Sequence, residues 1–363
     1  MSCCSPTPPP KSSKTAMALN PNLPKTANTG IPSPGGPDWM DFVVLLKSGD
    51  RAALGRALTL VESNLETDRP KAAALLDVLS SATHTAFRIG ISGIPGVGKS
   101  TWIETYGMRL LEQHPDARLA VLAVDPSSSV RGGSLLGDKT RMEKLSVHPR
   151  AFVRPSPAGT SLGGVTWGTR DAIALCERLG YTHVLVETVG VGQSETAVHD
   201  LVDCLVLLLM PASGDGLQGI KKGIMELADV IAVQKADGAL MEAAQQAASD
   251  ARAALRFTAV EENTWTVPVL TVSALTGDGM DALDEALDRF QRHALASGRW
   301  DDRRVMQRKK AYWEGLQRGL WDLFENQPGI RSEWDTLAQR VLEGEVDPRV
   351  AVERALEILS NRS

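Results

Sequence analysis

The chain has few cysteines, no long apolar run and no excess of basic charge, and each shortage excludes a class of protein. Four cysteines in 363 residues are too few for a disulfide framework, and none has zinc-site spacing. No apolar run approaches the roughly 18 residues of a membrane-spanning helix. The formal net charge of −5 provides no basic field for nucleic acid. Cys176 and Cys204 are therefore predicted to be buried free thiols.

The first 37 residues have no acidic side chain and are rich in Pro, Ser, Thr and Lys. They lack the apolar stretch of about 7–15 residues that a secretory signal requires. An organelle transit peptide would be rich in Arg and amphipathic, whereas this segment contains lysines and many prolines. We therefore predict a disordered tail over 1–38 and a cytoplasmic protein, with the mitochondrial matrix as the alternative in a eukaryotic cell.

Hydrophobic periodicity divides the rest of the chain into three regions. Residues 39–85 have apolar side chains at helical spacing and predict an N-terminal extension of two or three helices. Residues 86–297 alternate strand-like and helix-like segments, which predicts an α/β domain with a mostly parallel central sheet flanked by helices. Residues 298–363 are expected to be helical, and their four tryptophans indicate either core packing or a dimer interface. The expected strands are 87–92, 119–124, 151–154, 183–187, 204–210, 230–233 and 267–272.

The strongest motif is a phosphate-binding loop. It follows the first expected strand, precedes a helix, and fits the pattern G-x-x-x-x-G-K-[ST]. Its glycines let backbone N–H groups converge on phosphate oxygens, and the helix start adds partial positive charge. Lys99 is expected to reach the β and γ phosphates, and the Ser100 hydroxyl to bind Mg²⁺. The predicted nucleotide contacts are Gly93, Ile94, Pro95, Gly96, Val97, Gly98, Lys99, Ser100 and Thr101.

Acidic residues end two of the expected strands. Asp125 follows 119–124, and Glu187 closes 183–187. Because a nucleotide-bound Mg²⁺ takes oxygen ligands, both are candidate metal ligands, with capping of the next helix as the alternative. Asp138 is a further candidate, in the second polar, Gly-rich stretch. The glycines after Glu187 suit a loop that responds to a γ-phosphate, and the same loop contains Gln193, a candidate catalytic residue.

Two later segments favour guanine as the base. Gln234-Lys235-Ala236-Asp237 follows a strand, as the guanine-reading pattern Asn-Lys-x-Asp does. The Asp237 carboxylate would accept hydrogen bonds from guanine N1 and N2, and Lys235 would lay its stem along the base. Gln234 keeps the amide group of Asn but reaches one methylene further. The predicted second base loop, with backbone N–H groups that would meet guanine O6, is Ser273, Ala274 and Leu275; ATP is the competing interpretation.

Together these stretches resemble the MeaB–ArgK–MMAA family of P-loop GTPases, the chaperones of adenosylcobalamin-dependent acyl-CoA mutases. The resemblance implies Mg²⁺-site roles for Ser100, Asp125, Asp138 and Glu187. It also implies a further switch over 215–222, in which Lys221 moves toward the nucleotide when the mutase docks, and dimerisation through the C-terminal helices. It covers about residues 39–359 and depends on 93–101, 123–128, 132–142, 187–194, 214–229 and 273–274.

The implied function is a GTP-binding and hydrolysing chaperone, with Mg²⁺ and GTP or GDP bound. It would gate cofactor loading and protect or reactivate a mutase of the methylmalonyl-CoA mutase type, with Lys99, Lys221 and Gln193 as catalytic residues. One alternative is a metallochaperone GTPase for nickel-enzyme maturation, although no Cys-x-x-Cys occurs and the histidines are scattered. Another is an amino-acid transport ATPase or kinase. Gln234 stands where the family has Asn, and Gly216 where an acidic residue is common; these departures bear on guanine affinity and partner coupling.

Overall fold

Seven parallel strands form the central sheet, as the alternation of apolar runs predicts. The computed structural model describes residues 30–63, 65–80, 85–124, 142–154, 162–188, 194–211, 222–256, 265–325 and 329–360. Within these ranges the strand order is β3-β2-β4-β1-β5-β6-β7, and every pairing is parallel. The strands are β1 (Phe87–Ser92), β2 (Leu119–Val124), β3 (Ala151–Arg154), β4 (His183–Thr188), β5 (Cys204–Leu209), β6 (Val230–Val233) and β7 (Val269–Thr271).

Three strands differ from their predicted ranges: β4, β5 and β7. β5 ends at Leu209, one residue earlier than expected. β4 continues to Thr188, because Glu187 and Thr188 pair with Ala123 and Val124 at the end of β2. Glu187 is therefore held inside β4, one residue before the end of the strand. β7 starts at Val269, directly after Pro268, which has no N–H to give to a ladder.

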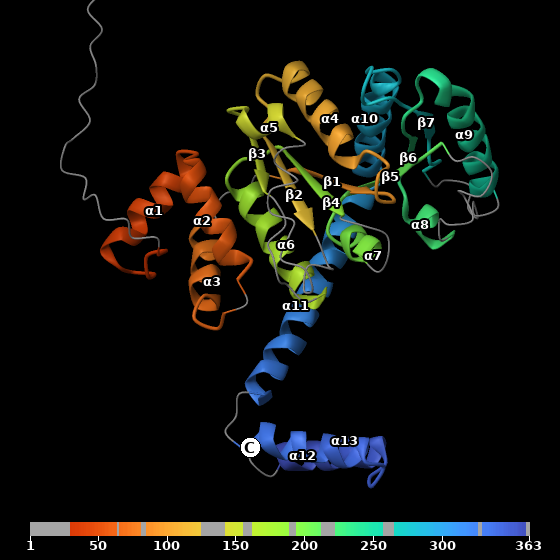
Figure 1. Cartoon of the computed structure of the whole chain (residues 1–363). Coiled ribbons are helices and arrows are strands. Elements are labelled where there is room, and N and C mark those ends of the chain that lie inside the picture. Colours follow the sequence, from red (N-terminus) through yellow and green to blue (C-terminus); the bar gives the residue numbers. More distant parts are fainter. Residues whose placement is uncertain are drawn as a thin grey trace, which may run out of the picture.

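The alternation of side chains along the strands decides which helices cover each face. In β5, Val206 and Leu208 belong to one core cluster, whereas Leu205 and Leu207 point to the opposite face. Burial on both faces explains why the strands are continuously apolar. One face is covered by α4 (Lys99–Gln113), α5 (Glu143–Val147) and α10 (Met280–Ala296), and the other by α6 (Leu162–Arg178), α7 (Ser194–His199), α8 (Lys222–Leu227) and α9 (Met241–Arg256) (Figure 1). The short η2 (Gly238–Leu240) directly precedes α9.

Three N-terminal helices pack beside the sheet, as the helical periodicity of that region predicts. They are α1 (Pro37–Lys47), α2 (Arg51–Val61) and α3 (Arg69–Val78). Asp50 caps α2, since its carboxylate accepts a hydrogen bond of 2.6 Å from the Ala53 amide. Leu58 and Leu75 are fully buried in the same apolar cluster as residues of α6, so these helices extend the core of the second face.

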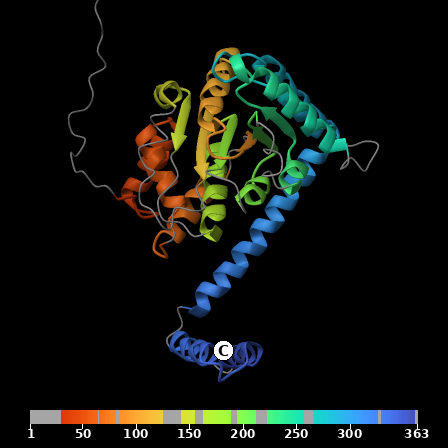
Figure 2. The same ribbon diagram turned by 45° about the vertical axis from the view of Figure 1, so that its right-hand side comes forward.

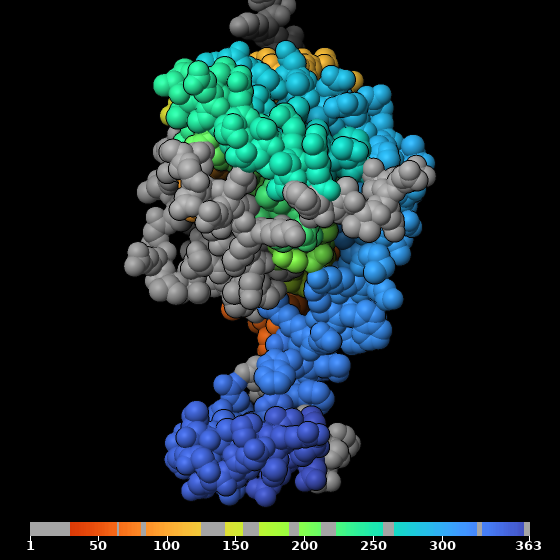
Figure 3. Space-filling model, turned by 90° about the vertical axis from the view of Figure 1, so that its right-hand side faces the viewer, coloured from red at the N-terminus to blue at the C-terminus, as the bar shows by residue number. Residues whose placement is uncertain are grey.

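The C-terminal helices form an arm that leaves the sheet. α11 (Arg299–Glu325) starts against the sheet edge and runs outward, carrying α12 (Ile330–Leu342) and α13 (Pro348–Ser360) at its far end (Figures 1 and 2). In the space-filling view these last two helices form a separate lobe (Figure 3). The tryptophans here differ in burial: Trp300 is buried in the core, whereas Trp313 and Trp321 are 53% and 57% exposed. None of the described helices is long and apolar enough to cross a bilayer.

Candidate functional site

The loop between β1 and α4 has a backbone shape that depends on glycine. Gly93, Gly96 and Gly98 have positive φ values of 151°, 81° and 101°. At Gly93 a Cβ would lie 2.6 Å from the Leu208 carbonyl oxygen of the neighbouring strand, so no larger residue fits. Gly98 is the N-cap of α4 and offers no side chain to the first helical N–H groups. The loop therefore presents the positive end of a 15-residue helix at the carboxyl edge of the sheet.

Lys99 and Ser100 open α4 and face this loop. The Lys99 ammonium group donates to the carbonyl oxygens of Gly93 at 2.7 Å and Ile94 at 3.4 Å. The Ser100 hydroxyl donates to Glu187 Oε1 at 3.2 Å, across from the end of β4. Both Ser100 and Glu187 are buried. The loop thus has a buried cation on one side and a hydroxyl–carboxylate pair on the other.

The hydroxyl–carboxylate pair fits a hard divalent cation. Ser100 and Glu187 supply two oxygen donors of the kind that Mg²⁺ takes. Glu187 lies on β4, and Ser100 lies in the first turn of α4, which follows the adjacent strand β1. Two other predicted ligands, Asp125 and Asp138, lie outside the described residues. The candidate catalytic residues Gln193 and Lys221 also lie outside them.

Two more loops meet at the same edge of the sheet, after β6 and β7. Lys235 Nζ donates to the carbonyl oxygen of Gly96 at 2.9 Å, which connects the loop after β6 to the phosphate-binding loop. The Ser273 hydroxyl donates to the Asp237 carboxylate, and the Ala236 amide donates to the Val272 carbonyl oxygen at 3.1 Å. The structure therefore brings together the residues that the sequence predicts for base recognition.

The predicted base-contacting residues differ widely in exposure. Gln234 and Ser273 are buried, Ala274 is 8% exposed, and Leu275 is 83% exposed. The Gln234 side-chain oxygen accepts hydrogen bonds from the amides of Lys235 at 3.3 Å and Ala274 at 3.4 Å. The side chain of Gln234 therefore lies directly between the two loops.

Comparison with known proteins agrees with this geometry. The family described as "Methylmalonyl Co-A mutase-associated GTPase MeaB" matches residues 54–328. The chain belongs to this family. It is therefore a P-loop GTPase, as the motifs and the resemblance predict.

Relatives in the MeaB family cover most of the chain. The chain is 47% identical over 313 residues to "Probable GTPase Rv1496" of Mycobacterium tuberculosis, covering 86% of this chain and 93% of that protein. It is 43% identical over 327 residues to the mouse "Methylmalonic aciduria type A homolog, mitochondrial", covering 87% and 78%. The solved structure titled "LAO/AO transport system kinase" is 31% identical, with a TM-score of 0.68 and coverage of 89% and 98%.

Sequence reasoning missed residues of this MeaB-family site that support the loops from behind. The Thr105 hydroxyl on α4 donates to the Ala274 carbonyl oxygen at 2.7 Å and so anchors the second base loop. Thr188 Oγ1 donates to the Ile91 carbonyl oxygen at 3.3 Å, close to the metal-side pair. No motif contains Thr105, and the 187–194 stretch contains Thr188 without giving it a role, because each threonine acts through a neighbour that only the folded chain supplies.

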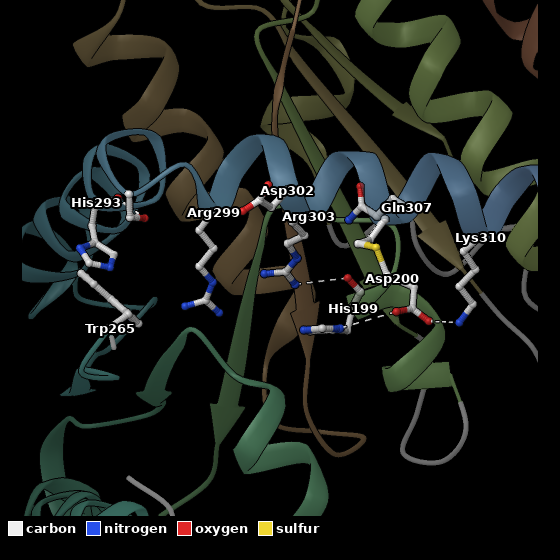
Figure 4. A pocket seen from close by; sticks show the side chains of 11 residues that line it. His199, Asp200, Trp265, His293, Arg299, Asp302, Arg303, Gln307 and Lys310 are labelled. Atoms are coloured by element: carbon white, nitrogen blue, oxygen red, sulfur yellow. Dashed lines mark hydrogen bonds and ion pairs between the residues drawn. The ribbon is translucent and has the colours of Figure 1, made fainter. Parts of the chain in front are cut away.

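A cavity of about 620 Å³ lies near the amino ends of the strands, between α11, the end of α7 and the end of α10 (Figure 4). Its central side chain, Arg303, donates to the carbonyl oxygens of Asp203 at 2.9 Å and His199 at 3.2 Å, and to the Asp229 carboxylate at 3.1 Å. Asp203 and Asp229 directly precede β5 and β6. These contacts fasten α11 to the amino ends of the strands, away from the nucleotide loops.

Proposed function

We propose that this GTPase is a chaperone that gates cofactor loading and protects or reactivates an adenosylcobalamin-dependent acyl-CoA mutase of the methylmalonyl-CoA mutase type. Membership of the mutase-associated GTPase family supports this proposal. The observation that carries the nucleotide part is the Lys235–Gly96 contact, which joins the base loop to the phosphate loop. The same family membership favours mutase chaperoning over nickel-enzyme maturation.

In this proposal the loop from Gly93 to Thr101 binds the phosphates. The Lys99 ammonium group would move from the loop carbonyl oxygens to the phosphate oxygens. A charged donor binds an anionic oxygen more strongly than it binds a neutral carbonyl oxygen. Ser100 and Glu187, with Asp125 and Asp138, would hold Mg²⁺. The bound ion would neutralise charge that develops on the transferred phosphoryl group. Gln193 and Lys221 would complete the catalytic set, and Lys221 would become competent only when the mutase docks.

For the base, Asp237 would accept from guanine N1 and N2, and the Lys235 stem would lie along the ring. The Ala274 amide would donate to guanine O6, with Ser273 and Leu275 shaping the loop around it. The contact between Ser273 and Asp237 supports this arrangement, because it orients the carboxylate before the base arrives. GTP is then the substrate and GDP the product, rather than the adenine nucleotides.

We propose the domain limits 39–85 for the helical extension, 86–297 for the GTPase domain and 298–363 for a dimerisation region. The exposed Trp313 and Trp321 on α11 support a homodimer, because a second copy would cover them. The expected compartment is the cytoplasm, or the mitochondrial matrix in a eukaryotic cell, where the mouse relative is named as mitochondrial.

The deciding experiment is single-turnover GTP hydrolysis with and without a purified adenosylcobalamin-dependent mutase. We expect slow intrinsic hydrolysis that the mutase accelerates, because Lys221 needs the partner to reach the nucleotide. A Lys221→Ala variant should keep the intrinsic rate and lose most of the acceleration. Unchanged hydrolysis with methylmalonyl-, isobutyryl- and ethylmalonyl-CoA mutases would contradict the chaperone function.

A further inference from the structure

Gln234 occupies an unusual position in the base-binding region. It directly follows β6, it is 2% exposed, and its amide donates to the Leu209 carbonyl oxygen at 2.8 Å. Its side-chain oxygen reaches the Ala274 amide of the other base loop at 3.4 Å. That amide is the donor that the proposed function gives to guanine O6.

The orientation of the Gln234 side-chain amide follows from its neighbours. The amides of Lys235 and Ala274 are both donors, so the side-chain oxygen rather than the nitrogen must face them. The nitrogen, Nε2, is then buried with no hydrogen-bond acceptor among the described residues. A buried donor without an acceptor is unfavourable, so this side chain is held by its oxygen contacts alone.

We infer that Gln234 gates the base site: its side-chain oxygen holds the Ala274 N–H and must be displaced by guanine O6. This inference rests on the proposed function. A single N–H cannot give a full hydrogen bond to two oxygens at once. Guanine O6 therefore accepts from the Ala274 N–H only after the bond from this N–H to Gln234 is broken. The affinity for guanine is then lower than it would be if the Ala274 N–H had no other acceptor.

The length of the side chain causes this competition. Asn is shorter by one carbon–carbon bond of about 1.5 Å. From the same backbone position its oxygen would move out of hydrogen-bonding range of Ala274, because the Gln234 contact at 3.4 Å is already long. An Asn at this position leaves the Ala274 amide open for the base, whereas Gln closes it.

The test compares GDP affinity in the full-length protein and in Gln234→Asn. We expect the variant to bind GDP about fivefold more tightly, since the competing bond is one ordinary hydrogen bond. The matched control is Gln246→Asn, the same chemical change on the exposed face of α9, which should leave GDP affinity unchanged. Unchanged or weaker GDP binding by Gln234→Asn would overturn the inference.

A second ligand tests the role of O6. The diphosphate of 2-aminopurine riboside has hydrogen where guanine has O6, so it does not need the Ala274 N–H. It also lacks the N1 hydrogen, but this loss affects the parent protein and the Gln234 variant equally. We expect Gln234→Asn to improve its binding less than it improves GDP binding. An equal gain for both ligands would mean that the substitution loosens the site in general, which contradicts gating at O6.

Two further measurements keep the test decisive. Gln234→Met has nearly the same length but no amide oxygen, so it should also tighten GDP binding; urea unfolding verifies that each variant is folded. Asp237→Ala and Lys99→Ala test the nucleotide site itself. If these two leave GDP affinity unchanged, the proposed function fails. If they weaken GDP binding while neither Gln234 variant tightens it, only the gating inference fails.

Discussion

The ammonium nitrogen of Lys235 lies 2.9 Å from the carbonyl oxygen of Gly96, so the loop after β6 is fastened to the loop after β1. Lys235 has a φ of 60°, and among the described residues it is the one non-glycine residue with positive φ. Such a backbone is strained for a residue with a Cβ. The strained backbone lies where the loop after β6 meets the phosphate-binding loop, and the Lys235 side chain turns back to contact Gly96.

Lys235→Gly and Lys235→Ala separate the side-chain contact from the backbone strain. Both variants lose the bond to Gly96, so both should bind GDP more weakly, by roughly tenfold for a charged hydrogen bond. The Ala variant keeps the strain without the contact and should be less stable than the Gly variant by about 1 kcal/mol. Calorimetric GDP titration and urea unfolding measure the two effects. Equal GDP affinity in Lys235→Ala and the parent protein would show that the contact has no role in binding.

Lys99→Ala tests the phosphate-binding loop directly. The ammonium group of Lys99 is buried at the loop carbonyls, and its removal should weaken GTP and GDP binding by roughly 100-fold or more, because charged hydrogen bonds to phosphate are lost. Lys47→Ala, on the exposed end of α1, is the control and should bind normally. Tight nucleotide binding by Lys99→Ala would contradict the site.

The junction between α11 and the sheet should be costly to break. Arg304 donates to both carboxylate oxygens of Asp203, at 2.8 and 2.6 Å, and both side chains are buried. Arg304→Met leaves a buried carboxylate without its cation and should reduce the free energy of unfolding by about 3–5 kcal/mol. The double variant with Asp203→Asn should recover part of that loss. A cost below about 1 kcal/mol for Arg304→Met would mean that the ion pair contributes little.

His183 predicts a pH dependence of stability. Burial, with a smaller contribution from His114, lowers the pKa of His183 to about 4, below its ordinary value near 6.5. The unfolded chain then binds a proton between about pH 6.5 and 4 that the folded chain does not, so this stabilisation is complete above pH 6.5 and is lost as pH falls. Between pH 7 and 5 the parent should lose on the order of 1–2 kcal/mol more than His183→Gln. Urea unfolding of both proteins at pH 7 and pH 5 measures this difference. An equal loss of stability in the parent and in His183→Gln would contradict the prediction.

The arm predicts the assembly state. Trp313 and Trp321 are more than half exposed in the single chain, and buried tryptophans contribute strongly to interfaces. Trp313→Ser/Trp321→Ser should shift the proposed dimer toward monomer by roughly 100-fold in dissociation constant, as measured by sedimentation equilibrium. Lys309→Ser, an exposed change on the same helix, should leave the dimer intact. A parent protein that is monomeric at micromolar concentration would contradict the dimer.

The local pattern of apolar residues and glycines was sufficient to predict the strands, the helices that follow them and the phosphate-binding loop. Apolar runs of strand length alternate with helical segments, and in a parallel sheet the carboxyl ends of all strands lie at one edge. Residues that directly follow β1, β6 and β7 could therefore be placed in one site from the sequence. The family resemblance, now confirmed, extended that prediction to the GTPase class.

Contacts between residues that are far apart in the sequence could not be predicted in this way. The oxygen of Gln234 on the Ala274 amide, the hydroxyl of Thr105 on the Ala274 carbonyl and the guanidinium of Arg304 on Asp203 all join residues that are 40 or more positions apart. Whether two such groups meet depends on strand order and on how far each side chain extends. The sequence showed only that Gln234 is one methylene longer than Asn.

The amino-acid sequence by itself determined that this protein has a nucleotide-binding edge, because glycine spacing and strand periodicity act over a few residues. Only the tertiary structure decided that Gln234 lies against the Ala274 amide, the donor that the proposed function gives to the base, and that Lys235 fastens the loop after β6 to the phosphate-binding loop. A difference of about 1.5 Å in side-chain length matters only when a hydrogen-bond partner lies within reach of the longer side chain. The fold places the Ala274 amide within reach of Gln234.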